Sequence, residues 1–332
     1  MQIFITGTNG FIGGAVASAL IADGHTVRGL VRNKAKADAV AAYGVEAVVG
    51  SLDDATLLQA EARAADAVVN AASSDHRGAV EALIAGLSGS GKPLIHSSGS
   101  SIVADLAMGE PSDRIFHEAT PIKPHVDKAA RVAIDRLVLA ASGIRSVVLC
   151  NTMIYGNALG APAQSVQIPA LVRQAKASGV ARYIGRGLNR WSNVHIADVA
   201  ALYTLAIAKA PTGTFMYVES GEEALAEISK AIAARLGLGA PQSWSAEQAT
   251  AAWGWNMVFS LGSNSRVRGK AAADLGWSPT QRSVTRWIAN AHWHLALASR
   301  RENEVAWLTS ALALRDAQQC LKFKSALETN RR

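Results

Sequence analysis

Cysteine is scarce in this sequence, and long apolar runs are missing from it. Its 332 residues include two cysteines, Cys150 and Cys320, which lie far apart. Two distant cysteines do not make the disulfide framework of a small secreted protein, and no segment resembles a signal peptide. No apolar run approaches the roughly 20 residues that a membrane-spanning helix needs. We therefore expect a protein of the reducing cytoplasm, without a membrane partner.

A concentrated basic surface is missing as well. The formal net charge is +7, but residues 283–332 hold eight Lys/Arg against four Asp/Glu. The rest of the excess is spread thinly, without the basic helix or the aromatic and basic patch of a nucleic-acid-binding domain. The 49% of hydrophobic residues can instead form the core of one large domain or of two intimate ones. This composition favours a small-molecule substrate and argues against a nucleic-acid partner.

The most informative segment is QIFITGTNGFIGG, residues 2–14. Its apolar run predicts a buried strand, and an apolar helical pattern follows among three regularly spaced glycines. Gly7 permits a sharp turn, Gly10 lets backbone N–H groups approach an anion, and Gly13 lets the helix lie tightly on the strand. The free N–H groups and the positive end of the helix suit a pyrophosphate. Against the alternative of a purely structural turn, we predict a dinucleotide site formed by Gly7, Thr8, Asn9, Gly10, Phe11, Ile12 and Gly13.

Short apolar runs and helical segments alternate along the chain. The runs predict strands at 25–31, 45–49, 67–70, 93–96, 145–149 and 214–218, and helical segments lie at about 54–63, 76–91 and 125–142. Parallel neighbours need such crossover connections, so the alternation predicts an α/β fold with a doubly wound parallel sheet between two layers of helices. Ligands of such sheets bind beyond the carboxyl ends of the strands. The site should therefore lie in the loops that follow the strands.

Basic residues follow the second predicted strand, where a dinucleotide site holds the adenosine ribose. A carboxylate there would favour the 2′-hydroxyl of NAD, but the chain has Arg32 and Lys34. Their charge-assisted hydrogen bonds suit a 2′-phosphate, so we expect NADP (NADPH) rather than NAD. The alternative is that both residues form the solvated start of a helix.

The next two strand ends offer further contacts to the cofactor. Asp53 can accept a hydrogen bond from the adenine amino group, unless it or Asp54 caps the following helix. The fourth strand ends in small residues, at which the backbone can pass close to the cofactor: Asn70, Ala71 and Ala72. These residues complete the predicted cofactor site.

Six short motifs resemble one known superfamily. They are TGTNGFIG (6–13), LDD (52–54), NAA (70–72), HSSGS (96–100), IYG (154–156) and NVHIADVA (193–200). In combination they resemble the extended, epimerase/dehydratase-like form of the short-chain dehydrogenases/reductases. Two longer segments, RYIGRGLNRWSNVHIADVAALYTLAIAKAP (182–211) and LGWSPT (275–280), are similar to a bacterial branch known only as NAD-dependent epimerase/dehydratase.

The resemblance covers about residues 1–288 and implies a domain organisation. A Rossmann-type NADP-binding domain would comprise residues 1–155 with returning segments near 190–220, and a smaller substrate-capping region would lie mainly in residues 156–288. The resemblance also implies a homodimer, which is common in the superfamily. Residues 289–332 lie outside the similarity, and their pattern predicts a C-terminal helical extension. We interpret His292-Trp293-His294 as part of that extension rather than as a metal site.

One feature of the superfamily is missing from the chain. Its chemistry usually rests on a serine or threonine and on a tyrosine four residues before a lysine, whose charge lowers the pKa of the phenol and lets it exchange a proton with the substrate oxygen. The chain has five tyrosines, and the residues four positions after them are Ala47, Leu159, Gly187, Ile207 and Gly221. The chain therefore lacks the usual Tyr-x-x-x-Lys pair.

The helix expected to carry that pair covers residues 124–142. Alignment on Asp135, the acidic residue common in this helix, gives Asp127 the tyrosine position and Arg131 the lysine position. If Lys128 is the conventional lysine instead, a proline takes the tyrosine position. Neither alignment restores a phenol.

Other groups of this helix can take over parts of the lost chemistry. Lys128 or Arg131 can hold the nicotinamide ribose, and a proton can come from Asp127 if burial raises its pKa, from His125, or from bound water. The alternative is an ordinary polar helix face.

The fifth predicted strand supplies the candidate hydroxyl groups. Ser98 and Ser100 flank Gly99, which falls nearest to the usual serine/threonine position. One of the two hydroxyls is expected to face the nicotinamide and polarise a substrate oxygen. Ser100 is slightly favoured, because its register better fits the serine-glycine-threonine variant of the similar bacterial branch. The alternative is that both serines satisfy the backbone of a turn.

Candidate substrate contacts lie further along the chain. Tyr155 follows the sixth strand and either lines the pocket or packs in the core. Arg190 lies near the position at which an arginine binds phosphate in nucleotide-sugar relatives, and Trp191 beside it favours a more apolar pocket. His195 and Asp198 are too few to indicate a metal, because a single histidine at a helix start is more often a cap. We predict no metal site.

These observations lead to three hypotheses. The first is an NADP-dependent oxidoreductase that acts on the carbonyl or alcohol of a small, rather apolar molecule. The second is a cofactor-sensing or scaffold protein that kept the nucleotide site and lost turnover. The third is a nucleotide-sugar epimerase or dehydratase, which the missing tyrosine weakens because these reactions also need a base.

Overall fold

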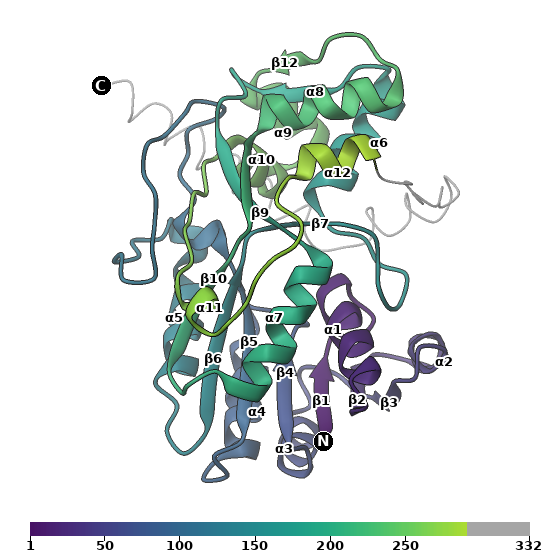
Figure 1. Ribbon diagram of the computed structural model, residues 1–332, viewed down its shortest axis with the longest axis vertical. Helices are drawn as coiled ribbons and strands as arrows, with labels where there is room; N and C mark the ends of the chain where they lie inside the picture. Colours follow the sequence, from purple (N-terminus) through teal and green to yellow (C-terminus); the bar gives the residue numbers. More distant parts are fainter. Residues whose placement is uncertain (291–332) are drawn as a thin grey trace.

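The computed structural model describes residues 1–290. A seven-stranded parallel sheet forms its centre, in the order β10-β6-β5-β4-β1-β2-β3 (Figure 1). The strands are β1 (Gln2–Thr6), β2 (Thr26–Val31), β3 (Glu46–Val49), β4 (Ala67–Asn70), β5 (Pro93–Gly99), β6 (Arg145–Asn151) and β10 (Thr214–Val218). The strand order reverses at β1, between β2 and β4, and such a switch point leaves a crevice at the carboxyl ends of the strands. The predicted parallel sheet is confirmed.

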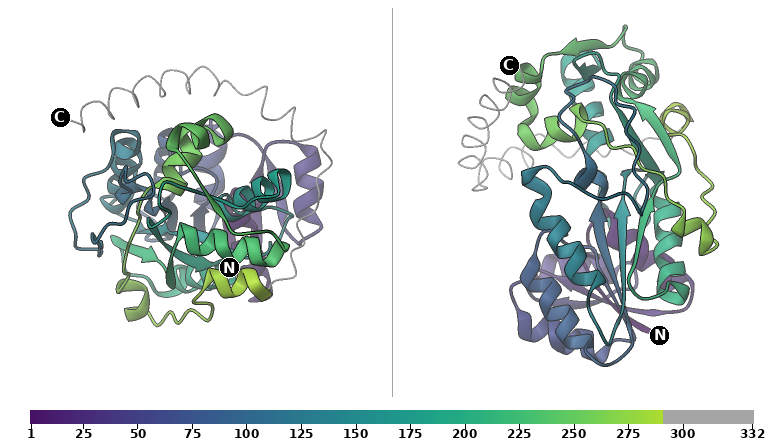
Figure 2. Two further views of the ribbon diagram at one scale, coloured as in Figure 1. Left: turned by 90° about the horizontal axis from the view of Figure 1, so that it is seen from above. Right: turned by 90° about the vertical axis from the view of Figure 1, so that its left-hand side faces the viewer.

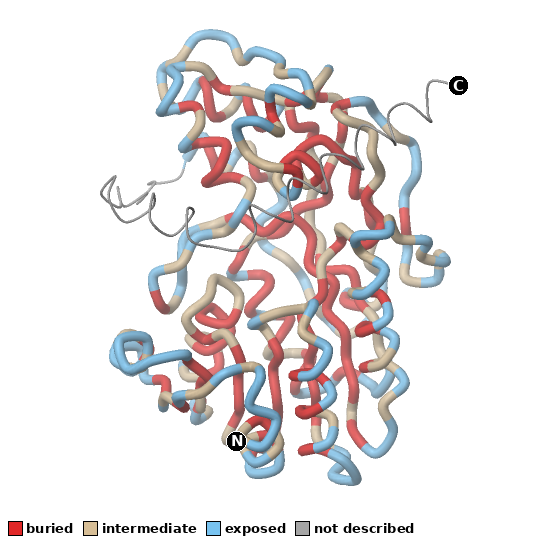
Figure 3. The backbone as a smooth tube through the Cα atoms, turned by 180° about the vertical axis from the view of Figure 1, so that it is seen from behind, coloured by how far each residue is buried: buried red, intermediate tan, exposed pale blue. Residues whose placement is uncertain are grey.

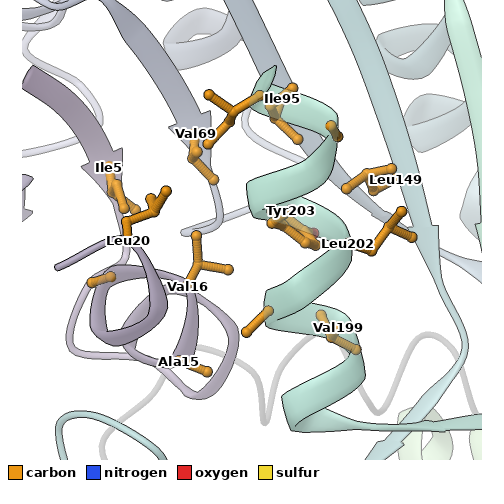
Figure 4. Close-up of a cluster of buried hydrophobic side chains, with 14 of the residues drawn as sticks. Ile5, Ala15, Val16, Leu20, Val69, Ile95, Leu149, Val199, Leu202 and Tyr203 are labelled. Atoms are coloured by element: carbon orange, nitrogen blue, oxygen red, sulfur yellow. The ribbon is translucent and has the colours of Figure 1, made fainter. Parts of the chain in front are cut away.

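Helices cover both faces of this sheet. One face carries α1 (Phe11–Ala22), α2 (Lys34–Ala41) and α7 (Ile196–Lys209), and the other carries α3 (Ala55–Ala64), α4 (Arg77–Leu87) and α5 (Ala129–Leu139). The right-hand view of Figure 2 shows α4 and α5 on one side of the sheet and α7 on the other. Figure 4 shows how α1 and α7 cover one core: Leu20 of α1 lies beside Ile5 of β1, and Leu202 of α7 lies beside Leu149 of β6.

The apolar run of β1 explains why this strand lies in the middle of the sheet. Ile3 and Ile5 belong to the core under α1 and α7, whereas Phe4 between them belongs to the core under α3, α4 and α5. Successive side chains of a strand point to opposite faces, so a strand covered on both sides must be apolar at every position. The tube in Figure 3 shows the resulting interior, in which the buried strands run between exposed loops.

A second region lies over the carboxyl ends of the parallel strands (Figure 1). It contains the three-stranded sheet β11-β9-β7 and the pair β12-β8. Its elements are β7 (Met153–Tyr155), α6 (Gln167–Ser178), β8 (Arg182–Ile184), β9 (Arg190–His195), β11 (Gly221–Ala224), α8 (Leu225–Leu236), β12 (Gln242–Trp244), α9 (Ala246–Trp253), α10 (Trp255–Gly262) and α12 (Val284–Asn290). The short helix α11 (Ala271–Asp274) instead packs beside β10 at the edge of the central sheet. Its own core includes Trp191, Trp255 and Phe259. We keep the proposed division into a dinucleotide domain and a capping region.

Residues 221–224 pair with β9 as strand β11, and α8 follows from Leu225. One predicted helix begins later than its sequence pattern indicated. The segment expected as one helix from residue 125 begins with the 3₁₀ turn η2 (Val126–Lys128), and α5 starts at Ala129. Candidate residues Asp127 and Lys128 therefore lie in η2, and Arg131 lies in the first turn of α5.

No helix within residues 1–290 is long and apolar enough to cross a membrane. The predicted C-terminal helical extension, with His292-Trp293-His294, lies almost entirely outside the described residues.

Candidate cofactor and active site

The glycine loop has the geometry that a tight strand-to-helix turn requires. Gly7 has a φ of +80°, and a Cβ on Gly13 would lie 2.2 Å from the carbonyl oxygen of Gly7. Only glycine allows α1 to approach the loop this closely. Gly10 is the N-cap of α1, with no side chain capping the helix. The first-turn N–H groups of α1 are therefore available to an anion.

A cavity of about 330 Å³ lies where the carboxyl ends of β4 and β5 meet the start of α1. It is lined by Ile12, Ala71, Ala72, Ser73, Ser74, Asp75, Ser97 and Ser98. The cavity thus joins parts of the glycine loop, the NAA motif and the HSSGS motif, which are far apart in the sequence. A larger hollow of about 670 Å³ lies between α1 and α7, but mostly alanines line it and it offers no comparable polar cluster.

The loop after β4 is fixed by buried hydrogen bonds. The Asn70 amide accepts from Thr6 Oγ1 at 2.6 Å and donates to His96 Nδ1 at 3.1 Å. Its amide nitrogen also lies 3.4 Å from the carbonyl oxygen of Ser73. Because the Asn70 side chain is buried and engaged, its contribution to the cavity is to position the backbone from Ala71 onward.

A buried carboxyl group lies directly behind the cavity. Ser98 Oγ donates to Asp135 Oδ2 at 2.7 Å, and His96 Nε2 lies 3.6 Å from Asp135 Oδ1. Within residues 1–290, neither His96 Nε2 nor Asp135 Oδ1 has a hydrogen-bond partner. Burial raises the pKa of Asp135 to about 6, although the Ser98 hydrogen bond and the charge of Arg131 act against it. Burial also lowers the pKa of His96 to about 4.

The two candidate serines have different surroundings. Ser98 lines the cavity. Ser100 is buried, and the Ser265 hydroxyl donates to its Oγ at 2.8 Å. The structure therefore favours Ser98, the reverse of the preference drawn from register. The reason is that β5 ends at Gly99 and the 3₁₀ turn η1 (Ser100–Val103) redirects the side chains that follow.

Arg131 lies at the edge of the site in a polar cluster. Its Nε donates to Asp75 Oδ1 at 2.9 Å, its Nη2 bonds the second oxygen of the same carboxylate, and its Nη1 lies 3.2 Å from Ser101 Oγ. Although burial acts to raise the pKa of Asp75, the Arg131 hydrogen bonds and charge lower it. A Cβ on Gly99 would lie 3.3 Å from Arg131 Nη1, so the guanidinium lies beside the position where the superfamily has its hydroxyl.

The η2 turn lies beneath aromatic residues of α10. Lys128 Nζ is 5.4 Å from the Phe259 ring centroid, and Trp255 Nε1 donates to Asp127 Oδ2 at 3.4 Å. The His125 ring packs against Phe259 at 5.6 Å. Burial, followed by the charge of Arg131, lowers the pKa of Lys128. The structure thus brings the candidates Asp127, Lys128 and Arg131 to one end of α5, under a partly aromatic cover.

The candidates for the adenosine end lie at the carboxyl ends of β2 and β3. Arg32 is exposed and makes no ion pair with any residue from 1 to 290, whereas the exposed Lys34 pairs with Asp38 at 3.1 Å. Asp54 caps α3 through the Leu57 N–H, so the capping alternative applies to it. Asp53 is exposed and lies 3.0 Å from His76 Nε2.

The three candidate substrate residues are engaged in the capping region. Tyr155 is fully buried between the rings of His195 and Trp287, as its packing alternative anticipated. Arg190 forms an ion pair with Glu222 at 2.8 Å. Trp191 is buried and donates to the Ser263 carbonyl at 2.7 Å. The structure does not bring these side chains to the cavity lining.

The residues at the start of α7 have structural partners. His195 caps the helix by accepting from the Ala197 N–H, and Asp198 accepts from Thr280 and Gln281. In the described part of the chain, no three His, Cys, Asp or Glu side chains gather as a metal site would require.

Comparison with known proteins places the chain in a family. The model of the NAD dependent epimerase/dehydratase family matches residues 3–217. The chain belongs to this family. The recognised motifs TGTNGFIG, NAA, HSSGS and NVHIADVA all lie within the matched residues.

Relatives of this epimerase/dehydratase family protein include oxidoreductases. Oxidase ucsJ from Acremonium sp is 31% identical, with 84% of this chain and 92% of the oxidase covered. The 4-hydroxy-2-methyl-3-oxo-4-farnesyl-3,4-dihydroquinoline-1-oxide ketoreductase from Stigmatella aurantiaca is 26% identical, over 67% of this chain and 69% of that protein. The family and these relatives identify the chain as a protein of the NAD(P)-dependent oxidoreductase or epimerase kind.

Solved structures share the fold. The dTDP-glucose 4,6-dehydratase (rfbB) from Bacillus anthracis str. Ames, in complex with NAD, has a TM-score of 0.69 at 18% identity, over 87% of this chain and 94% of that one. The UDP-glucose 4-epimerase from Thermotoga maritima, with UDP-glucose, has a TM-score of 0.69 at 16% identity, over 87% and 96%. At these identities the likeness shows the fold alone.

The residues of this family protein fit a dinucleotide. The closest approach in the loop, between Gly13 and Gly7, leaves no room for a side chain, and Thr8 Oγ1 is buried without a hydrogen-bond partner among residues 1–290. Such a loop presents backbone N–H groups to a diphosphate. The fit rests on the chain's own geometry.

The buried pair His96 and Asp135 should leave a signature in the pH dependence of stability. Asp135 titrates at about 6 in the folded chain instead of 3.8, so its contribution to stability falls as the pH rises through this interval. His96 titrates at about 4 instead of 6.5, so its contribution grows as the pH rises through that interval. In the wild type the two contributions oppose each other.

Replacing Asp135 with asparagine should therefore remove one of the two opposing contributions and leave that of His96. Relative to wild type, D135N should gain stability as the pH rises from about 4 to about 6. Urea denaturation of both proteins at a series of pH values measures this difference. A difference that stays flat, or that falls with pH, would contradict the assigned titration of Asp135.

Proposed function

We propose that the protein is an NADP-dependent oxidoreductase, which transfers a hydride to or from the carbonyl or alcohol carbon of a small, rather apolar molecule. The observation that carries this proposal is the cavity that joins the glycine loop to the serines of β5. A nicotinamide ring in this cavity would lie next to hydroxyl groups that can orient a substrate oxygen. The oxidase and ketoreductase relatives support the same kind of chemistry.

The proposed cofactor would be held along the carboxyl ends of the strands. The diphosphate would lie at the first turn of α1, the adenine near Asp53, and the 2′-phosphate at Arg32 and Lys34. Arg131 and Lys128 would contact the nicotinamide ribose. When bound, the nicotinamide supplies or accepts the hydride.

The chain's own groups would favour the charged transition state. Ser98 orients the substrate oxygen from the cavity wall. The positive charges of Lys128 and Arg131 stabilise the negative charge that develops on that oxygen as hydride arrives. Partial burial of both cations strengthens this effect, because the interaction is screened less than in water.

The apolar character of the substrate is supported by the residues above η2. Trp255 and Phe259 are both buried in the capping core, and Phe259 lies over Lys128 and His125. Arg190 already forms an ion pair with Glu222, so its charge is not available for a phosphate. This arrangement suits an apolar ring better than a sugar diphosphate. The ketoreductase relative is named for a farnesyl-substituted quinoline oxide, whose farnesyl chain is apolar.

The preference for NADP can be tested at Arg32. The R32A variant should raise the KM for NADPH roughly 10- to 100-fold, because a charge-assisted hydrogen bond contributes about 1.5–3 kcal/mol. The KM for NADH should barely change. K36A, which removes an exposed cation from the same helix start, is the matched control and should leave both values alone. Equal effects of R32A on the two cofactors would remove the basis for NADP.

The proposed activity itself is tested by binding and turnover together. NADPH and NADH are titrated by fluorescence, and apolar aldehydes, ketones and alcohols are then screened for an absorbance change at saturating cofactor. We expect tighter binding of NADPH and turnover of at least one carbonyl or alcohol. Failure to bind either cofactor would contradict the proposal.

A second function is favoured by the missing phenol. Tyr155, Tyr203 and Tyr217 are buried, and burial raises the pKa of each. A protein that kept the nucleotide site and lost turnover would act as a cofactor sensor or scaffold. Tight NADPH binding without turnover across the substrate panel would favour this function.

The third candidate, a nucleotide-sugar epimerase or dehydratase, predicts tight binding of a nucleotide sugar instead.

A further inference from the structure

The adjacent serines Ser97 and Ser98 connect the cavity to two different buried groups. Both line the cavity. Because successive residues of a strand face opposite sides of the sheet, Ser97 meets α7 and Ser98 meets α5. The Tyr203 hydroxyl donates to Ser97 Oγ at 2.8 Å, and Ser98 Oγ donates to Asp135 Oδ2 at 2.7 Å. Each serine could therefore exchange a proton with a titratable group behind it.

We propose that Asp135 and Ser98 form the route by which a proton reaches the substrate oxygen, in place of the missing tyrosine. The inference rests on the proposed oxidoreductase function. Ser98 is the catalytic residue, since it touches the substrate, and Asp135 acts through it. Neither the family match nor the superfamily's Tyr-x-x-x-Lys pair assigns such a role to an aspartate at this position.

The step balances in both directions. In a reduction the bound cofactor would supply a hydride to the carbonyl carbon, and the π electrons of the C=O bond would move to the oxygen. When Asp135 is protonated, its O–H donates to Ser98 Oγ and the Ser98 hydroxyl turns to the substrate, the reverse of the hydrogen bond that Ser98 makes to the carboxylate. The substrate oxygen takes the proton of the Ser98 hydroxyl, while Ser98 Oγ takes the proton of the Asp135 carboxyl group. The alcohol, the oxidised cofactor and the Asp135 carboxylate result. During oxidation the same protons move the other way.

The surroundings of Asp135 suit a group that gains and loses a proton. Because the Asn70 amide donates to Nδ1 of His96, the proton of this neutral ring lies on Nε2, 3.6 Å from Asp135 Oδ1. The imidazole can therefore donate to the carboxylate once it forms. Arg131, the nearest positive charge, also favours the carboxylate.

The remaining titratable groups near Asp135 have smaller effects on its protonation. Asp75 disfavours the Asp135 carboxylate but is itself paired with Arg131. Cys150 and Tyr217, which also face this carboxyl group, are kept neutral by burial. The pKa of Asp135, about 6, leaves both of its protonation states accessible near neutral pH.

The route through Ser97 is less suited to the task. The Tyr203 hydroxyl already donates to Ser97 and accepts from the Asn151 amide at 2.8 Å. Burial raises the pKa of Tyr203 to about 12, so the phenol would have to ionise far above neutral pH to exchange a proton. Asp135 has an oxygen without a hydrogen-bond partner among residues 1–290, whereas Tyr203 is fully engaged.

The experiment compares the two routes in otherwise matched variants. D135N and S98A interrupt the proposed route, Y203F interrupts the other, and S98T restores a hydroxyl. NADPH affinity is measured by fluorescence titration. Single-turnover reduction of phenanthrenequinone, an apolar dicarbonyl probe, is then followed by NADPH absorbance at a series of pH values. We expect D135N and Y203F, whose side chains do not line the cavity, to bind NADPH as the wild type does.

We expect the wild-type rate of reduction to fall as the pH rises through about 6, because the protonated form of Asp135 is the donor. D135N and S98A should lose roughly 100-fold or more of the rate and lose this pH dependence. S98T should recover most of the rate, and Y203F should keep both the rate and the pH profile. A merely structural role of Asp135 would not remove the pH dependence while leaving NADPH affinity unchanged.

An infrared measurement detects the protonation state of Asp135 without turnover. Difference spectra of the unloaded protein should contain a carboxylic-acid carbonyl band that disappears as the pH rises through about 6 and is absent from D135N. D135N with a wild-type rate and pH profile, or Y203F with the losses expected of D135N, would overturn the route and leave the proposed function intact. A wild type that binds NADPH but reduces no carbonyl would overturn both.

Discussion

Replacing Gly13 with alanine is expected to weaken cofactor binding severely. The new Cβ would lie 2.2 Å from the Gly7 carbonyl oxygen and 2.7 Å from its carbonyl carbon, both of which are backbone atoms. Such a contact can be relieved only if α1 moves away from the loop, and overpacking of this kind costs about 1–3 kcal/mol or more. The movement also withdraws the first-turn N–H groups from the diphosphate position. We expect the Kd for NADPH to rise roughly 100-fold or more.

Gly78 provides the matched control for this substitution. It is an exposed glycine of α4, and a Cβ there would find its nearest neighbour at 3.8 Å. G78A should leave NADPH affinity unchanged and should keep or slightly raise stability, because alanine favours the helix. Fluorescence titration and urea denaturation of both variants test the expectation. Wild-type affinity in G13A would show that the diphosphate does not depend on this turn.

Removal of the Arg131 guanidinium should produce the second large effect. R131A takes away the cation that lies beside Gly99 and Ser101, and it leaves the Asp75 carboxylate without its two-point partner. The lost charge-assisted contacts contribute about 1.5–3 kcal/mol, so kcat/KM should fall roughly 10- to 100-fold. R131K should recover only part of this loss, because an ammonium group cannot reproduce the planar two-point contact.

Arg77 is the control for charge removal. Its guanidinium pairs with Glu81 on the exposed face of α4, and such surface pairs contribute about 0–1 kcal/mol. R77A should therefore keep the wild-type kcat/KM for NADPH-dependent reduction. If R131A kept it as well, Arg131 would have no part in the chemistry beyond its pairing with Asp75.

The fold could be predicted because its signals are local. Parallel strands covered on both faces read as short apolar runs, and β1, β2, β4 and β10 appear in the sequence with nearly their observed bounds. The glycine loop could be recognised for the same reason, because the turn needs glycine at fixed positions. The carboxyl ends of β5 and β6 were harder to predict from the sequence. Ser97–Gly99 and Cys150-Asn151 belong to these strands because the two strands pair with each other there, and no apolar pattern marks them.

The active site was only partly predictable, because it depends on contacts between distant residues. Arg131 could be found from its place in the helix, but its partner Asp75 lies 56 residues away. Ser101 was missed because the turn after β5 breaks the alternation of the strand. His96 and Asn70 could be noticed in the sequence, because both are polar side chains at the ends of buried strands. Asp135 could be recognised only as the acidic residue common in its helix, without an indication of its contact with Ser98.

A crystal structure of the protein soaked with NADP⁺ tests the central claim most directly. We expect diphosphate oxygens at the backbone N–H groups of the first turn of α1, the 2′-phosphate against Arg32, and the nicotinamide ring in contact with Ser98. A nucleotide bound elsewhere, or a crevice left empty at saturating NADP⁺, would contradict it.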